Sequence, residues 1–136
     1  MPALRQYRIF ISHAWAYNDH YHSLVGWFNN AANFWWFDHS VPEHDPLQVN
    51  SDTALRRKLD DQIKGCHAVV IMGGMYVNYR RWIQAEIDLA LRYNKPIIVV
   101  RPWGSQVLPK VLQDVAHEIV AWQSANVIDA IRSHAL

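Results

Sequence analysis

The sequence predicts an α/β domain, a doubly wound parallel sheet of about five strands with helices on both faces. Two observations predict this fold. Short apolar runs alternate along the chain with longer segments of helical periodicity, which is typical of repeated strand–helix units. Two of the runs, Ala68–Met72 and Ile97–Val100, are continuously apolar, as are strands that helices cover on both faces. The length of 136 residues suits one domain, residues 1–136.

The first strand–helix unit starts at Tyr7. Residues 7–11 form a short apolar strand, and residues 12–15 form its exit loop. Asn18 or Asp19 caps a helix over about residues 20–32, because a short polar side chain accepts hydrogen bonds from the free N–H groups of a first turn. The apolar stripe of this helix is Leu24, Val25, Phe28, Ala31 and Ala32.

The second unit begins with an aromatic run, residues 34–37, of strand length. The loop over residues 38–50 is longer than the roughly 2–6 residues usual between a strand and a helix, and long loops in compact domains are often functional. Ser51 or Asp52 then caps a helix that ends at Gly65. Its buried stripe is Leu55, Leu59 and Ile63.

The C-terminal half completes the pattern. Strands are expected over residues 68–72, 97–100 and 118–121. Helices are expected over about residues 81–93, over residues 107–116 and onward from a Ser124 cap. A polar turn separates the third strand from its helix. The inward side chains of the two longer helices are Ile83, Ile87, Ala90, Leu91, Val127, Ile128 and Ile131.

Composition and charge argue against several classes of function. The net charge of +1 does not suit a dedicated nucleic-acid binder or a polybasic membrane tether. No apolar run approaches the roughly 20 residues that span a bilayer, and the N-terminus does not resemble a signal peptide. The single cysteine, Cys66, excludes an internal disulfide. We therefore expect a cytoplasmic protein, with neither nucleic acid nor membrane as a partner.

Glu86 is the most informative residue, because it follows Trp82 by four positions. Residues four apart lie on one face of a helix, so an indole and a carboxylate are expected together near a helix start. Right-handed crossovers bring every strand-to-helix loop to the carboxyl edge of a parallel sheet, where ligands bind. A carboxylate beside an aromatic wall suits chemistry that develops positive charge. The alternative is a solvated carboxylate near a helix N-terminus, favoured by the helix dipole.

Four segments in order resemble the TIR domain family. They are Tyr7 to His13, an apolar strand that leads into Ser-His; residues 38–50, at the place of the family's BB loop; Tyr76 with Trp82-Ile83-Gln84-Ala85-Glu86-Ile87, similar to the Tyr…Trp-Cys-x-x-Glu-Leu block; and Lys95 to Val100. The Ser-His-x-Trp and Trp-Ile-x-x-Glu-Ile texts look closest to the prokaryotic branch that includes the ThsB proteins of Thoeris anti-phage defence. The resemblance implies a flavodoxin-like fold. Ile83 departs from the usual Cys, and loop 38–50 has its own sequence, which prevents transfer of partner specificity from other branches.

The resemblance implies an enzyme that cleaves NAD⁺ at the nicotinamide–ribose bond and releases nicotinamide. In the prokaryotic immune branch the ADP-ribosyl unit is typically rejoined as a cyclic signal or otherwise modified, and this diffusible nucleotide activates a separate effector protein. NAD⁺ is then a substrate, and no cofactor is implied. No Gly-x-Gly-x-x-Gly follows any predicted strand, which argues against a hydride-transfer cofactor site. The resemblance also allows a homo-oligomer.

The chemistry of this bond explains the residues needed. Its cleavage gives an oxocarbenium-like ribose, and a fixed carboxylate stabilises that charge. Glu86 is the catalytic candidate, and no second carboxylate is required because the departing nicotinamide is already cationic in the substrate. Cyclisation needs water excluded and a substrate nucleophile folded back on the ribose. Aromatic side chains serve both needs, and the candidates are Phe10, Trp15, Tyr76 and Trp82.

The other candidate substrate-binding residues each have a structural alternative. Ser12 binds phosphate or ribose, or it caps a turn. Arg81 holds the pyrophosphate, or it is solvated at a helix start. His13 follows the first strand and is a candidate substrate contact, and Asp45 belongs to a loop that closes over the site. Phe10 and Trp82 also fit as core residues.

The eight histidines do not predict a metal site. His20 and His22 are too close in sequence for the i,i+4 spacing of two ligands on one helix face. His13, His39 and His44 fall in loops expected at one edge of the sheet. They have no cysteine partners and no recognisable ligand spacing, so we predict no metal.

Other functions compete with NAD⁺ cleavage. A non-enzymatic TIR adaptor assembles through its loops and has no need of Glu86. A nucleoside deoxyribosyltransferase-like base exchanger uses a related fold and a Glu on other nucleosides. A phospho-receiver needs an acidic pair after the first strand and an Asp at the end of the third, where this chain has Ser12-His13 and Met72-Gly73. The receiver is excluded, and the adaptor and the exchanger remain as alternatives.

Overall fold

The computed structural model describes residues 5–12, 18–38, 52–72, 76–101, 108 and 110–136, with the backbone alone for residues 18–21, 52–55 and 76–82. The strands are β1 (Gln6–Ser12), β2 (Trp35–Asp38), β3 (Ala68–Met72), β4 (Ile97–Val100) and β5 (Glu118–Val120). The helices are α1 (Asn18–Asn30), α2 (Asp52–Gly65), α3 (Tyr76–Arg92), α4 (Lys110–Val115) and α5 (Ser124–His134).

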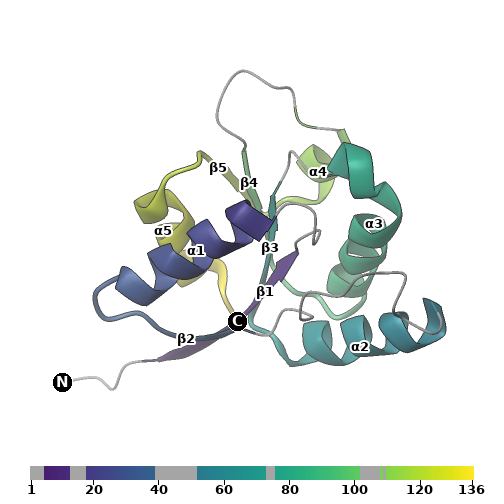
Figure 1. The fold of residues 1–136 in the computed structure, drawn as a ribbon, viewed down its shortest axis with the longest axis horizontal. Helices are drawn as coiled ribbons and strands as arrows, with labels where there is room; N and C mark the ends of the chain where they lie inside the picture. Colours follow the sequence, from purple (N-terminus) through teal and green to yellow (C-terminus); the bar gives the residue numbers. More distant parts are fainter. Residues whose placement is uncertain (1–4, 13–17, 39–51, 73–75, 102–107, 109) are drawn as a thin grey trace.

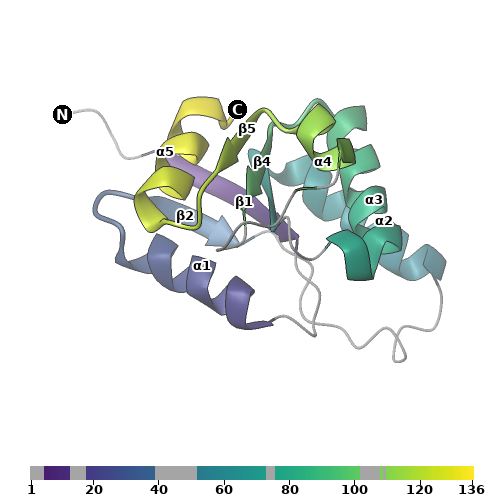
Figure 2. The same cartoon turned by 90° about the horizontal axis from the view of Figure 1, so that it is seen from above.

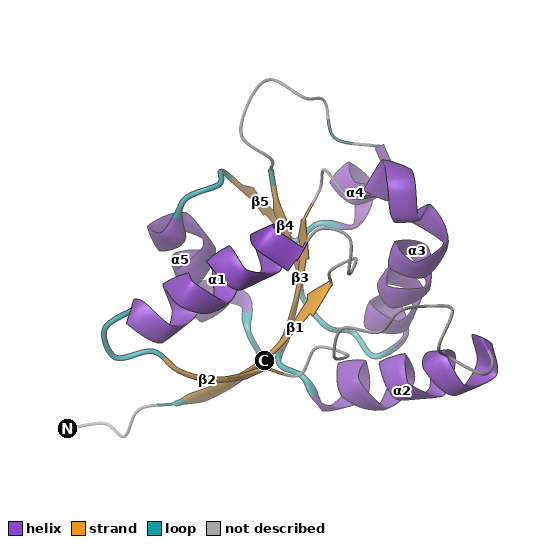
Figure 3. Cartoon of the chain, viewed as in Figure 1, coloured by secondary structure: helices purple, strands orange, loops and turns teal. Residues whose placement is uncertain are grey.

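The strands form one parallel sheet in the order β2-β1-β3-β4-β5. Helices α1 and α5 cover one face, and α2, α3 and α4 cover the other (Figures 1 and 3). The view from above shows the sheet between these two layers (Figure 2). This is the predicted flavodoxin-like fold. The chain moves outward from β1 to β2, then crosses back to β3 on the other side of β1, so the strand order reverses between β1 and β3.

The core explains why these segments form strands. Every residue of β3 and of β4 is buried, as expected for central strands covered on both faces. At the other end of the sheet, aromatic side chains join β2 to α1. Phe28 of α1 contacts Phe34 and Trp36, with ring centroids 5.6 Å and 5.0 Å away, and Tyr7 of β1 stacks on Phe34 at 5.1 Å. These contacts anchor β2, the strand at the edge of the sheet.

Several predicted details are wrong. Helix α1 ends at Asn30, so Ala32 of its expected stripe lies beyond it and is exposed. Helix α3 begins at Tyr76, five residues before the expected Arg81, so the segment expected as a turn contributes its first turns. Leu91 was expected in the core face of this helix and is 48% exposed. Ser124 is the first residue of α5, and the cap position belongs to Gln123, which makes no side-chain capping hydrogen bond.

Most of the long loop, residues 39–50, lies outside the described residues. In the described part of the chain, no helix combines the length and the apolar character that crossing a membrane requires.

Candidate functional site

Among the side chains that the structure describes, two polar ones are buried, and they lie together. Ser12 is 1% exposed and Glu86 is 6% exposed. The Ser12 hydroxyl lies close enough to the Glu86 carboxyl to affect its pKa. Buried polar groups in proteins nearly always have a structural or functional reason. Both residues were predicted site residues, so their pairing defines the candidate site.

Ser12 reaches this place because it ends β1. It is paired in register with Ile71 of the neighbouring β3. Side chains alternate between the two faces of a strand, and Tyr7 packs on the α1 side, so Ser12 faces the opposite layer with α3. Phe10 shares that face. The position at the carboxyl end of β1, beside β3, is the switch point where open α/β sheets bind ligands.

Glu86 reaches the same place from the middle of α3. Ile83, Ile87 and Ala90 turn toward the core, and Glu86 follows Ile83 by three positions on that side of the helix. The helix begins ten residues earlier, at Tyr76, which corresponds to about 15 Å of helix at the standard rise. Its first turns project beyond the end of β1 (Figure 1). A residue in mid-helix therefore lies level with Ser12, and the expectation of Glu86 near the helix start is wrong.

Burial sets the protonation of this site. Loss of contact with water raises the pKa of Glu86 to about 8, and the nearby Ser12 hydroxyl opposes this shift in part. Neither Ser12 Oγ nor Glu86 Oε2 has a hydrogen-bond partner in the described part of the chain. Burial without compensating charge favours the neutral acid. A carboxyl with a strongly shifted pKa, at a switch point, is a typical feature of a functional site.

The structure brings together some of the predicted residues and does not test others. Phe10 is 1% exposed and belongs to the core, on the same face of β1 as Ser12. Tyr76, Arg81 and Trp82 all lie in α3, Trp82 one turn before Glu86, but their side chains are not among those described. The remaining candidates, His13, Trp15 and Asp45, lie outside the described residues and stay predictions.

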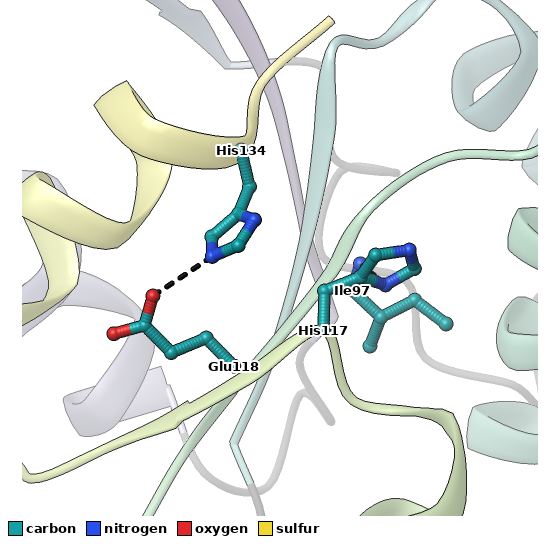
Figure 4. A network of polar contacts seen from close by, with 4 residues as sticks. All are labelled: Ile97, His117, Glu118 and His134. Atoms are coloured by element: carbon teal, nitrogen blue, oxygen red, sulfur yellow. Dashed lines mark hydrogen bonds and ion pairs between the residues drawn. The ribbon is translucent and has the colours of Figure 1, made fainter.

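Three described histidines, His67, His117 and His134, have structural roles at the opposite edge of the sheet. His117 Nδ1 accepts a hydrogen bond from the backbone N–H of Ile97 at 3.0 Å, and His134 Nε2 lies 2.8 Å from Glu118 Oε1 (Figure 4). His67 Nδ1 accepts from the backbone N–H of Arg8 at 2.9 Å. Within the described residues, no cluster of three or more potential metal ligands occurs.

A groove runs along the outer side of α3, between this helix and α2. It is lined by Arg56, Arg57, Asp60, Asp61, Ala85, Asp88 and Leu89. Asp88 is exposed and Leu89 is partly buried, whereas Glu86 is buried, and neither Ser12 nor Glu86 is among the lining residues. The groove is therefore separate from the Ser12–Glu86 pair.

Comparison with known proteins gives one family. Residues 10–107 match the sequence model of a family described as Thoeris protein ThsB, TIR-like domain. This range includes both Ser12 and Glu86 and spans more than half of the chain. Among proteins of curated function, none matches the sequence.

Several solved structures share the fold. A CMP N-glycosidase of Clostridium botulinum is 17% identical, with a TM-score of 0.57 over 92% of this chain and 98% of that chain. A de novo designed Rossmann 2x3 protein is 8% identical, with a TM-score of 0.53 over 93% and 86%. A 3-dehydroquinate dehydratase-like protein of Bifidobacterium longum is 9% identical, with a TM-score of 0.50 over 95% and 94%. At these identities the likeness concerns the fold alone.

Proposed function

The chain belongs to the family of ThsB TIR-like domains of Thoeris defence, and from this membership we propose that it is an NAD⁺-cleaving enzyme. It would release nicotinamide and convert the ADP-ribosyl unit, in cyclic form, into a signal for a separate effector protein. The observation that carries the proposal is the buried carboxyl of Glu86 beside Ser12 at the switch point of the sheet. A non-enzymatic adaptor that assembles through surface loops would gain nothing from an acid in this position.

The proposed step needs an ionised Glu86. The bond between ribose C1′ and the nicotinamide ring nitrogen breaks, and its electron pair neutralises the pyridinium. Positive charge develops on the ribose, and the carboxylate stabilises it in a site sheltered from water. A nucleophile then adds at C1′ and loses its proton. This nucleophile is either water or an atom of the substrate itself, which a closed site favours.

The test is incubation of the purified protein with NAD⁺, followed by mass spectrometry of the products. We expect nicotinamide and an ADP-ribose-derived product from the wild type, and about 10²–10³-fold less from Glu86→Gln, as for loss of one strong charge-stabilising group. Asp88→Asn is the matched control, because Asp88 is an exposed carboxylate two positions away on the same helix. Equal nicotinamide release by Glu86→Gln and wild type would reject the assignment of Glu86.

The defence signal is tested in a second assay. Filtered, protein-free product from phage-infected cells that express the chain is added to a candidate effector of the same system. Activation by wild-type extract but not by Glu86→Gln extract supports a diffusible nucleotide. Activity of the enzyme without any effector response would limit the proposal to NAD⁺ cleavage.

One observation favours a second candidate, a base exchanger or N-glycosidase acting on other nucleosides. A carboxyl that keeps its proton near neutral pH is a suitable general acid for a departing neutral base. The similar structure from Clostridium botulinum is a CMP N-glycosidase. Incubation with CMP and with cytidine, with and without a free isotope-labelled base, distinguishes this activity. Release or exchange of cytosine without attack on NAD⁺ would favour the second candidate.

A further inference from the structure

The surroundings of Glu86 contain no cation that would hold its charge, within the described residues. From β1 it meets Ser12, which shares its face of the strand with the buried Phe10 and, toward the amino end, with the exposed Arg8. From α3 its inward neighbours are Ile83, Ile87 and Ala90. The other described charged side chains of β1, α2 and α3 that lie outside the groove are exposed, namely Arg8, Lys58, Lys64 and Arg92. Five charged side chains of α2 and α3 line the outer groove. They are Arg56, Arg57, Asp60 and Asp61 of α2 and Asp88 of α3.

This arrangement is unfavourable for a carboxylate and much less so for a carboxylic acid. Burying an ionised carboxyl without a counter-charge costs several kcal/mol, and proteins avoid that cost by keeping the proton. Glu86 Oε2 and Ser12 Oγ both lack a described partner, so the pair also has unused hydrogen-bonding capacity. The shifted pKa of Glu86 agrees with this geometry.

We propose that the Ser12–Glu86 pair selects its ligand by charge, because the resting site holds a neutral acid that gives up its proton when a cationic ring enters. Binding then follows one balanced exchange. The Glu86 O–H bond breaks, its electron pair stays on the carboxylate, and the proton passes to solvent as the ligand cation takes its place. The inference rests on the proposed function and adds a substrate class to it: N-glycosides of cationic rings in preference to neutral ones.

Two ligands of nearly equal shape test the exchange. Carba-NAD⁺ keeps the pyridinium charge but lacks the cleavable bond, and NADH carries a neutral dihydronicotinamide. Calorimetric titration at pH 7 in phosphate and in Tris, whose ionisation enthalpies differ, counts the protons released on binding. We expect nearly one proton per site with carba-NAD⁺ and none with NADH, and at least tenfold weaker binding of NADH.

The pH dependence of affinity gives an independent readout. Carba-NAD⁺ affinity should rise by close to tenfold per pH unit while the free site is protonated, and should level off above about pH 8. NADH affinity should stay flat over that range. In Glu86→Gln, carba-NAD⁺ should bind without proton release, with a flat pH profile and with an affinity within a few-fold of NADH. Asp88→Asn should behave as the wild type.

The outcomes separate this inference from the proposed function. Glu86-dependent cleavage of NAD⁺ together with proton-neutral binding of carba-NAD⁺ would overturn charge selection and leave the enzyme assignment intact. Equal affinity for carba-NAD⁺ and NADH would overturn it as well. Proton release that persists in Glu86→Gln would assign the proton to another group and overturn the role of Glu86. Failure to bind carba-NAD⁺ and to cleave NAD⁺ would overturn both proposals.

Discussion

At the scale of single residues, Glu86 makes the stability of the protein depend on pH. Its pKa is raised from 4.5 to about 8 on folding, so the folded chain binds this proton more tightly than the unfolded chain does. The contribution of Glu86 therefore makes the free energy of unfolding highest below pH 4.5, and this free energy falls as the pH rises toward 8. Above the folded pKa the loss is complete and amounts to several kcal/mol.

Glu86→Gln removes this dependence while keeping the shape of the side chain. Urea unfolding at a series of pH values should give similar stabilities for the two proteins near pH 4.5, with a growing advantage for Glu86→Gln up to about pH 8 and a constant advantage above. Asp88→Asn changes an exposed carboxyl and should leave the wild-type profile unchanged. If the free energy of unfolding depended on pH in the same way for wild type and Glu86→Gln, the carboxyl of Glu86 would be exposed to water in the folded protein.

Ser12→Ala separates stability from activity. The hydroxyl is buried without a described partner, so its removal should leave stability unchanged or raise it by up to about 1 kcal/mol. The hydroxyl lowers the pKa of Glu86, so the variant should need a higher pH to ionise Glu86. We expect about tenfold lower nicotinamide release at pH 7, with the rising limb of the pH–rate profile moved upward. Ser133→Ala, on the exposed side of α5, is the control.

The sequence predicts each member of this pair but not their contact. Glu86 was identified by its place in the Trp82-to-Ile87 block, and Ser12 by its place at a strand end. Their contact depends on two facts that a single sequence does not carry: the neighbour of β1 in the sheet, and the height of α3 above it. Burial, which raises the pKa, is likewise a product of the tertiary fold.

At the scale of elements, helix α3 ends in a Schellman motif that explains Asn94. The Lys95 N–H donates to the Ala90 carbonyl at 2.8 Å, and the Asn94 N–H donates to the Leu91 carbonyl at 3.2 Å. Asn94 itself has a φ of 55°, in the left-handed region. Side chains with a Cβ are strained there, and Asn less so than most. The motif stops the helix and directs the chain into β4.

Asn94→Gly should raise the free energy of unfolding by several tenths of a kcal/mol, since Gly adopts this φ without strain. Asn94→Ala should lower it by about 1 kcal/mol for the opposite reason. Urea unfolding measures both. Neither variant should change nicotinamide release, because Asn94 lies eight residues beyond Glu86, past the C-terminal end of the helix. Equal stability of the Gly and Ala variants would contradict a left-handed Asn94.

The elements that the sequence predicts best are those with burial on both faces. Strands β3 and β4 have their expected bounds, because a short, continuously apolar run in an α/β domain is typical of a strand that helices cover on both faces. The start of α3 was placed too late, although Tyr76 and Tyr79 precede Ile83 by seven and four positions and extend its periodicity. Leu91 was assigned to the core face by its helical spacing from Ile83 and Ile87, but tertiary packing leaves it exposed.

At the scale of the whole molecule, the sheet has an uncovered apolar edge. Trp36 of β2 packs against Phe28 of α1, so the neighbouring Trp35 and Phe37 face the other layer. These two side chains are about half exposed, at 50% and 49%. Edge strands with exposed apolar side chains promote association between chains.

Replacement of Trp35 and Phe37 together by Thr should reduce self-association while keeping the strand propensity of β2. Stability should change by less than about 1 kcal/mol, because both rings are half exposed. Light scattering across a concentration series measures the first effect, and urea unfolding the second. Trp36→Thr is the contrasting variant, and it should lose stability because its ring packs on Phe28. Unchanged scattering by the double variant would show that this edge does not govern association.

The architecture as a whole was predictable from alternating strand and helix patterns, whereas the walls of the site were not. The sequence places the expected contributors His13, Trp15 and Asp45 in connecting segments, where no hydrophobic periodicity predicts a conformation. Ser12 and Glu86 lie on regular elements, so their positions follow from the sheet and its helices.

The C-terminus has a practical consequence for building sensors. The Leu136 N–H donates to the His67 carbonyl at 3.1 Å, and His67 precedes β3 at the amino edge of the sheet. Leu136 therefore lies at the amino edge of the sheet, whereas β1 ends in Ser12 at the carboxyl edge (Figure 1). A fluorescent reporter attached at Leu136 is thus held at the edge of the sheet opposite the proposed site and should leave that site unobstructed.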